Sequence, residues 1–187
     1  MTDFVEDYLT EHEDIIDELS TEDIYSIVTA LSALRDRKGR LFILGVGGSA
    51  ATASHAVNDF RKISAIETYT PTDNVAELTA RTNDDGWHTA YVEWLRVSSL
   101  CANDIVMVVS VGGGGDNVSQ PIVEAVSYAV EVGSQVLGIV GRDGGYTKQV
   151  ADVCLLIPPL YPDFTTAHTE SIASVVLHLV TAHPALA

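Results

Sequence analysis

Continuous apolar runs alternate along the chain with segments whose apolar residues recur at helical spacing. An uninterrupted apolar run is typical of a strand that is buried on both faces of a sheet. Such runs lie at 41–47, 65–70 (the weakest), 104–111, 135–141 and 152–158. Helical spacing marks the segments 49–62, 84–101, 117–132, 145–150 and 168–182. Strands that alternate with helices predict an α/β fold with a five-stranded parallel sheet and right-handed crossovers.

Two more helices are predicted before the first strand, within residues 3–38. Apolar residues such as Phe4 and Ile15 recur there at helical spacing, and the sequence from Ser20 to Asp23 is typical of a cap that begins a second helix. The apolar faces of these helices need a partner, either the sheet of the same chain or a neighbouring subunit. We expect one domain over 1–187, with N-terminal helices over 1–39 and an α/β core over 40–187.

Composition narrows the class of protein. The chain has 187 residues, 47% of them hydrophobic, and a formal net charge of −16. This apolar content excludes wholesale disorder, and the negative charge argues against partners such as nucleic acid or an anionic membrane. No apolar run has the length of a membrane span, and the N-terminal residues do not resemble a signal peptide. Cys101 and Cys154 lie in apolar strings and are predicted to be buried thiols. We expect a cytoplasmic protein.

The first of two glycine-rich loops follows the first predicted strand and opens a helix. Its sequence, GVGGSAA at 45–51, lets backbone N–H groups approach an anion, and the helix N-terminus adds partial positive charge. Ser49 either donates its hydroxyl to a ligand or caps the helix. The loop also fits a loose dinucleotide fingerprint, with Glu67 at the position of the ribose-binding acid.

The second loop, SVGGGGDN at 110–117, carries four consecutive glycines between a buried strand and a helix. Such a run is costly in backbone entropy. A nest of backbone N–H groups that binds an anion explains it better than a flexible connection. Asn117 is expected to begin the next helix, and Asp116 is expected to point away from a bound phosphate.

His55 and Asp59 are four residues apart on one predicted helix, and Glu170 and His178 are eight apart on the last one. Each pair therefore shares a helix face. Two imidazoles and two carboxylates suit a divalent metal, and they suit acid–base proton transfer equally well. Solvated surface groups are a third interpretation that spacing alone leaves open.

Four motifs, in this order, resemble the sugar isomerase domain family and are most similar to its phosphoheptose isomerase branch. They are GVGGSAATASH at 45–55, TNDDG at 82–86, the loop at 110–117 and GRDGG at 141–145. The resemblance covers nearly the whole chain. It implies a flavodoxin-like three-layer sandwich with a five-stranded parallel sheet, assembled as a homotetramer with active sites between subunits. It also implies a sugar phosphate ligand, which replaces the dinucleotide interpretation.

The resemblance assigns roles to the histidine and carboxylate pairs. It implies a divalent metal, most simply zinc, held by His55, Asp59, Glu170 and His178. It makes Asp59 the catalytic base and His178 the catalytic acid. Asp59 stands where the family has Glu, which shortens the side chain by one methylene. Glu170 stands where the family has Gln, and the added negative charge favours a cation.

The resemblance also implies a set of sugar-phosphate-binding residues, namely Gly47, Gly48, Ser49, Asn83, Asp84, Ser110, Gly112, Gly113, Gly114, Gly115 and Glu170. Three hydroxyls of the family's phosphate loop are lost here, and of that loop only Ser110 keeps one. Val46 and Ala167 replace an Asn and an Asp of the family. His168 is expected to offer a contact in place of the missing Asp.

These features predict a ketose–aldose isomerase for a sugar phosphate, most like the interconversion of sedoheptulose 7-phosphate and glycero-manno-heptose 7-phosphate through an enediol. One alternative is a non-catalytic regulatory or scaffold protein of the same family, similar to the replication-initiator-associating protein. Another is an isomerase for a modified sugar phosphate in secondary metabolism.

Overall fold

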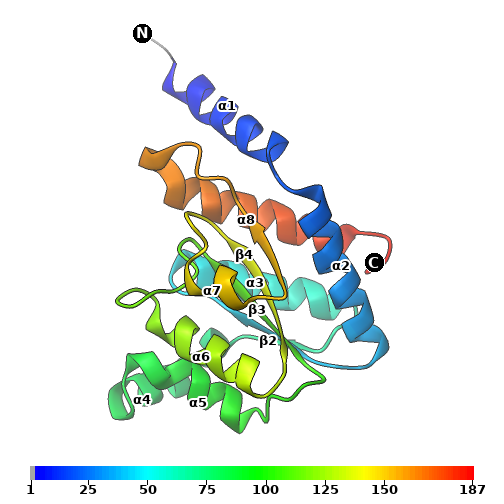
Figure 1. Ribbon diagram of the computed structural model, residues 1–187, viewed down its shortest axis with the longest axis vertical. Helices are drawn as coiled ribbons and strands as arrows, with labels where there is room; N and C mark the ends of the chain where they lie inside the picture. The colour runs from blue at the N-terminus through cyan, green and yellow to red at the C-terminus, as the bar shows by residue number, and fades with distance from the viewer. Residues whose placement is uncertain (1–2) are drawn as a thin grey trace.

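The computed structural model describes residues 3–187 and contains one parallel sheet of five strands (Figure 1). The strands are β1 (Leu41–Leu44), β2 (Thr68–Tyr69), β3 (Ile105–Ser110), β4 (Gln135–Val140) and β5 (Val153–Leu156). Their order in the sheet is β2-β1-β3-β4-β5. In this flavodoxin-like order the chain reverses its direction of travel across the sheet between β1 and β3, and ligands bind at the carboxyl ends of the strands there. The predicted fold class is confirmed.

Helices cover both faces of the sheet (Figure 1). They are α1 (Phe4–Asp17), α2 (Thr21–Asp36), α3 (Gly48–Lys62), α4 (Val75–Asp84), α5 (Ala90–Val97), α6 (Gln120–Glu131), α7 (Gly145–Val150) and α8 (Thr165–Ala182). Short 3₁₀ helices lie at Pro71–Asp73, Trp87–Thr89 and Pro162–Phe164. In the described part of the chain, none of these helices is both long and apolar enough to cross a membrane.

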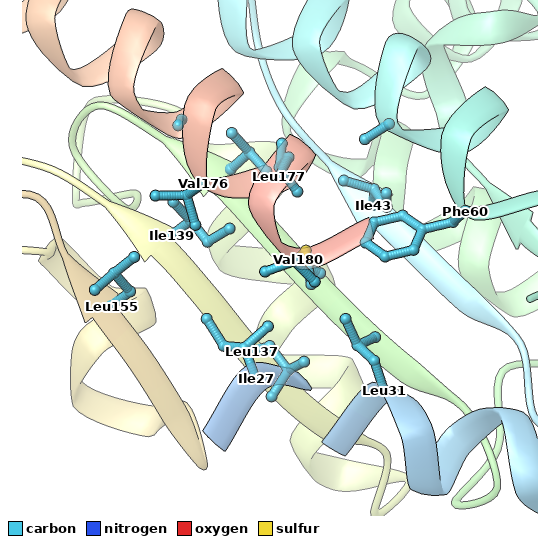
Figure 2. Packing of buried hydrophobic residues seen from close by; sticks show 14 of the residues in the cluster. Ile27, Leu31, Ile43, Phe60, Leu137, Ile139, Leu155, Val176, Leu177 and Val180 are labelled. Atoms are coloured by element: carbon cyan, nitrogen blue, oxygen red, sulfur yellow. The ribbon is translucent and has the colours of Figure 1, made fainter. Parts of the chain in front are cut away.

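Alternation along the strands divides the core into two layers. Leu41 and Ile43 of β1 pack with α2, α3 and α8 on one face, where Phe60 and Leu177 are also buried (Figure 2). Phe42, between them in the sequence, packs on the other face with residues of α5 and α6. Each fully buried side chain of this size stabilises the fold by roughly 1.5–3 kcal/mol. The two faces place α3 and α6 on opposite sides of the sheet.

The structure differs from the predicted helices mainly between β2 and β3. The segment predicted as one helix over 84–101 contains a 3₁₀ turn and the short helix α5, and α4 precedes it unpredicted. Gly86, with φ of 91°, separates α4 from this turn. Helix α6 begins at Gln120 and not at Asn117, because Gly115 and Val118 form a β-bridge that lengthens the loop.

The two predicted N-terminal helices are present, and they differ in how far they are buried. Ser20 caps α2, since its Oγ accepts a hydrogen bond of 3.2 Å from the N–H of Asp23. Helix α2 buries Leu31 against the sheet. Helix α1 extends from the body beside α8 and leaves Phe4 and Leu9 mostly exposed (Figure 1).

The prediction of buried cysteines is wrong for Cys101, which is exposed, while Cys154 is partly buried. Cys101 precedes β3 in a turn, and its backbone N–H and its Sγ both donate to the Asp104 carboxylate. Cys101 therefore contributes hydrogen bonds to this turn and does not pack in the apolar core. Burial raises the pKa of the Cys154 thiol to about 11.

An ion pair joins the amino ends of β1 and β3. Arg40 donates from Nη2 and Nε to the two carboxylate oxygens of Asp104, at 2.6 and 3.1 Å. The Asp104 side chain is 2% exposed. Burial alone would raise the pKa of Asp104, but hydrogen bonds from Arg40 and from the Cys101 N–H lower it below its usual 3.8. The pair lies at the end of the sheet opposite to the glycine loops.

Candidate functional site

Asp59 lies between two histidines at the surface where α3 packs beside α8 (Figure 1). Its Oδ2 is 3.5 Å from Nε2 of His55, one turn earlier on α3, and 3.5 Å from Nε2 of His178 on α8. The two imidazole rings meet nearly edge to face, with centroids 5.0 Å apart. Both histidine side chains are more than half exposed, whereas Asp59 is 14% exposed. Residues from two distant parts of the chain thus share one carboxylate oxygen.

The donor set of this cluster fits a divalent transition metal. One ligand atom from each of His55, Asp59 and His178 lies within 4.8 Å of the other two. Two imidazoles and one carboxylate are a set that zinc accepts, with a fourth position left for water or substrate. The cavity between them is only about 10 Å³ in volume. That space suits an ion and is far too small for a sugar within one chain.

Glu170 does not join this cluster. It is eight residues before His178 on α8, and its carboxylate lies against the first residue of α3. The carboxylate oxygens are 2.5 and 2.6 Å from the point that a Cβ on Gly48 would occupy. The sequence predicted four ligands in one set, and the structure brings three of them together. Glu170 instead places a negative charge at the N-terminal end of α3, where the helix dipole favours an anion.

A buried tyrosine forms a hydrogen bond to the first glycine loop. Tyr91 of α5 donates its hydroxyl to the Gly45 carbonyl at 2.7 Å, and burial raises the pKa of Tyr91 to about 12. Gly47, with φ of 64°, is the N-cap of α3. Ser49 is buried within the first turn, and its side chain makes no capping hydrogen bond in the described structure. The capping interpretation of Ser49 is therefore wrong.

The second glycine loop packs directly on the loop that follows β4. A Cβ on Gly113 would lie 1.9 Å from the carbonyl oxygen of Gly144, and one on Gly145 would lie 2.2 Å from that of Gly112. Gly113 also has φ of 66°. Close approach of two backbones explains these glycines, in addition to any anion that the loop binds.

Part of this loop's hydrogen-bonding capacity is used within the chain. The Gly113 N–H donates to Oγ of Ser110 at 3.1 Å, and the Gly115 N–H donates to the carbonyl of Val118. The Gly113 carbonyl accepts from Oγ1 of Thr147 at 2.7 Å. These hydrogen bonds hold the loop as the rim of a hollow. They also leave fewer backbone N–H groups free to bind an anion than the sequence predicts.

A hollow of about 690 Å³ opens above this rim. Gly112, Gly114 and Gly115 line it together with Arg142. Its volume is in the range of small-molecule sites. In the sequence, Arg142 stands out only as part of the GRDGG motif at 141–145, and it was not predicted as a binding residue. The position of this motif directly after β4 was the signal that could have identified Arg142, because loops at the carboxyl ends of neighbouring parallel strands lie close together.

Three other candidates lie elsewhere in the chain. Asn83 and Asp84 are exposed at the end of α4 and line neither the small cavity nor the large hollow. His168 is 2% exposed, and its Nε2 is 2.7 Å from Oε2 of Glu11 on α1. Its other ring nitrogen faces His12 at 3.4 Å. The prediction that His168 contacts the sugar finds no support in this arrangement, because α1 covers it.

The chain is similar to known proteins both in structure and in sequence. No family model matches the chain. A phosphoheptose isomerase structure from Neisseria gonorrhoeae superposes with a TM-score of 0.82 at 23% identity, covering 95% of both chains. The sheet order and this superposition thus define an α/β protein with the fold of that isomerase.

Relatives found by sequence identify the family to which the chain belongs. A phosphoheptose isomerase from Syntrophotalea carbinolica is 30% identical over 185 residues, which are 94% of this chain and 89% of that protein. A lincomycin biosynthesis protein from Streptomyces lincolnensis is 33% identical over 158 residues, 78% of this chain and 56% of that longer protein. The chain belongs to the phosphoheptose isomerase family.

Proposed function

We propose that this protein interconverts a ketose phosphate and an aldose phosphate, with sedoheptulose 7-phosphate as the reference substrate. Membership of the phosphoheptose isomerase family supports the reaction class. The observation that carries the proposal is the contact of Asp59 with both His55 and His178. An isomerase of this kind must move one proton between carbon atoms and another between oxygen atoms. A carboxylate beside an imidazole can do both, since each group can accept and donate a proton.

In the proposed reaction Asp59 removes a proton from C1 of the ketose while the C2 carbonyl oxygen gains one from His178. The product of this step is an enediol. His178, which has lost its proton to O2, then accepts the proton from O1, and Asp59 returns its proton to C2, which makes C1 the aldehyde and restores both side chains. One hydrogen has moved from C1 to C2 and one from O1 to O2, so no oxidant or reductant is needed. Oδ1 of Asp59 accepts from Nδ2 of Asn58 at 3.0 Å, which orients Oδ2 toward the histidines.

We further propose that His55, Asp59 and His178 bind a divalent cation, with zinc favoured by the two imidazoles. When bound, such an ion supplies positive charge beside the substrate oxygens. Glu170 joins the ligands only if its carboxylate leaves Gly48, and its negative charge favours cation binding from either position.

The same site is proposed to be completed by a second subunit of a homotetramer. The small cavity at Asp59 cannot enclose a sugar, and both histidines are open to solvent in one chain. Val175 and Leu179, which flank His178 on α8, are almost half exposed and offer an apolar surface for a neighbour. Asn83 and Asp84 would then act from another chain. The molar mass in solution tests this assembly.

A modified sugar phosphate is the second candidate substrate. The similarity to a lincomycin biosynthesis protein favours it, since that relative belongs to a biosynthetic route for a specialised product. Val46, Gly112 and Ala167 also differ from the residues that the family places around the sugar. Altered contacts at these positions change which sugar fits without removing Asp59 or His178.

Exchange of the C1 proton in deuterated water tests the proposal. The purified protein is incubated with sedoheptulose 7-phosphate and a panel of ketose phosphates, and deuterium at C1 is followed by NMR. We expect incorporation with at least one substrate, lost in Asp59→Asn. No exchange with any substrate would contradict the isomerase function and favour the non-catalytic scaffold, whose partner binding would then survive Asp59→Asn.

A further inference from the structure

We propose that Arg142 is a phosphate-binding residue, which grips the phosphoryl group of the substrate from the wall of the large hollow. The inference rests on the proposed function and deepens it, because it names the side chain that confers selectivity for a phosphorylated sugar. Neither the glycine loop nor the histidine cluster supplies a cationic side chain for this purpose.

Arg142 is distinguished by having no hydrogen-bond or ion-pair partner for its guanidinium within the described residues. The protein has seven arginines. Six of them donate to carbonyls or pair with carboxylates, namely Arg35, Arg37, Arg40, Arg61, Arg81 and Arg96. Among residues 3–187, none of the hydrogen bonds or ion pairs involves the guanidinium of Arg142, although the chain carries 26 acidic residues. An unpaired guanidinium at a hollow is ready to bind an anion.

The position of Arg142 matches the phosphate loop. Its Cδ and Nη1 both lie 4.0 Å from the point that a Cβ on Gly112 would occupy, so the side chain extends along the loop. Gly112 and Arg142 line the same hollow. The backbone of Arg142 has φ of 50°, a left-handed conformation that is rare outside glycine and common at functional sites.

Two carboxylates also line the hollow, and both leave the guanidinium free. Oδ1 of Asp143 accepts from the N–H of Gly145 at 3.1 Å, which turns it toward α7. Asp116 lines the same hollow, and neither carboxylate forms an ion pair with Arg142. Asp116 does lower the local potential, so its charge opposes an anion that Arg142 attracts.

The guanidinium also explains how the loop tolerates its lost hydroxyls. Three hydroxyls that the family uses are glycine or valine here, and the Gly113 N–H is already bonded to Ser110. A guanidinium forms two parallel hydrogen bonds to a phosphate, and charge-assisted bonds are about twice as strong as neutral ones. One arginine therefore replaces much of what several hydroxyls would supply.

The test compares Arg142→Gln with Arg37→Gln, which removes the same charge from an exposed residue at the other end of the sheet. For isomerisation, we expect Arg142→Gln to raise KM for the phosphorylated ketose about 10- to 100-fold and to leave kcat within about twofold. The inhibition constant of inorganic phosphate should rise by a similar factor. Arg142→Lys should restore part of the loss, and Arg37→Gln should change neither constant.

The variant Arg142→Gly distinguishes a structural role of Arg142 from a role in phosphate binding, because glycine readily adopts the left-handed backbone conformation at this position. This variant should unfold at an equal or higher temperature and still bind phosphate as weakly as Arg142→Gln. Unchanged KM and phosphate inhibition in both variants would overturn the proposal, and so would a loss confined to kcat.

Calorimetric titration with inorganic phosphate keeps this test independent of catalysis. If the wild type isomerises no sugar phosphate, the proposed function fails, but phosphate binding that weakens in Arg142→Gln still supports Arg142. If the wild type is active and its phosphate affinity does not depend on Arg142, only the assignment of Arg142 fails.

Discussion

Asp59 and His178 lie within 3.5 Å of one another through Oδ2 and Nε2, although they belong to the first helix after β1 and the last helix of the chain. Nε2 of His55 is also 3.5 Å from the same oxygen. A single carboxylate oxygen is thereby the common centre of the proposed acid, base and metal ligands. Its substitution therefore affects proton transfer and metal binding together.

Asp59→Asn should lower turnover by about 10²- to 10⁴-fold, since an amide cannot accept the C1 proton. The surrounding histidines are exposed, so the free energy of unfolding should change by less than about 1 kcal/mol. Steady-state kinetics and urea unfolding measure the two effects. Asp59→Glu, which restores the longer acid of the family, should keep activity equal to or above the wild type. Wild-type turnover in the Asn variant would remove Asp59 as the base.

Metal analysis should find about one divalent ion per chain, as expected for one built site. The double variant His55→Ala/His178→Ala should lose this ion, because two of the three clustered ligands disappear. His88→Ala, a change at an exposed histidine outside the cluster, is the matched control and should retain it. Removal by a chelator should lower turnover, and added zinc should restore it. If the wild-type protein contains no metal when purified and its turnover does not change when zinc is added, the cluster has only acid–base roles.

Gly113→Ala should destabilise the fold by about 2–5 kcal/mol, since its Cβ meets the Gly144 carbonyl at 1.9 Å on a left-handed backbone. Gly115→Ala is the control in the same loop, because a Cβ there meets nothing within 4 Å. It should change the free energy of unfolding by less than about 1 kcal/mol. Urea denaturation at one fixed protein concentration compares the two variants. Equal stability would show that the loops around Gly113 and Gly144 separate readily.

Asp104→Asn should destabilise the protein by about 2 kcal/mol at neutral pH, because Arg40 loses its charged partner. The pKa of Asp104 is lower in the folded protein than its usual 3.8, so the ion pair contributes fully above that value. The contribution disappears as the pH falls through the lowered pKa. The stabilities of wild type and variant should therefore converge only at a pH below the lowered pKa of Asp104. A difference that is independent of pH would assign the effect to packing.

Tyr91→Phe should cost about 1–3 kcal/mol, since the buried carbonyl of Gly45 loses its 2.7 Å hydrogen bond. Because Gly45 begins the first glycine loop, KM for the sugar phosphate should rise as well, while metal content stays unchanged. Thermal unfolding and kinetics on the same preparation report both effects. Full stability in the Phe variant would show that water replaces the hydroxyl.

Much of the architecture was accessible from local patterns. Apolar runs identified all five strands, and the alternation of Leu41, Phe42 and Ile43 between the two faces follows from strand geometry alone. The pairing of His55 with Asp59 also follows from helical spacing. Helix α4 was missed because none of its ten residues is fully buried and its Leu78 packs only partly against the core, so its apolar pattern is weak.

Tertiary packing decided the rest. Sequence spacing placed Glu170 and His178 on one helix face, but only the contact of α8 with α3 shows that His178 reaches Asp59 and that Glu170 reaches Gly48. The same holds for Arg142, whose freedom from ion pairs depends on where every acidic residue of the chain lies. The sequence by itself determined the elements, the glycine loops and the kinds of chemical group present. Which groups meet was decided by the packing of helices on the sheet, because contacts between distant segments depend on three-dimensional geometry that local periodicity does not encode.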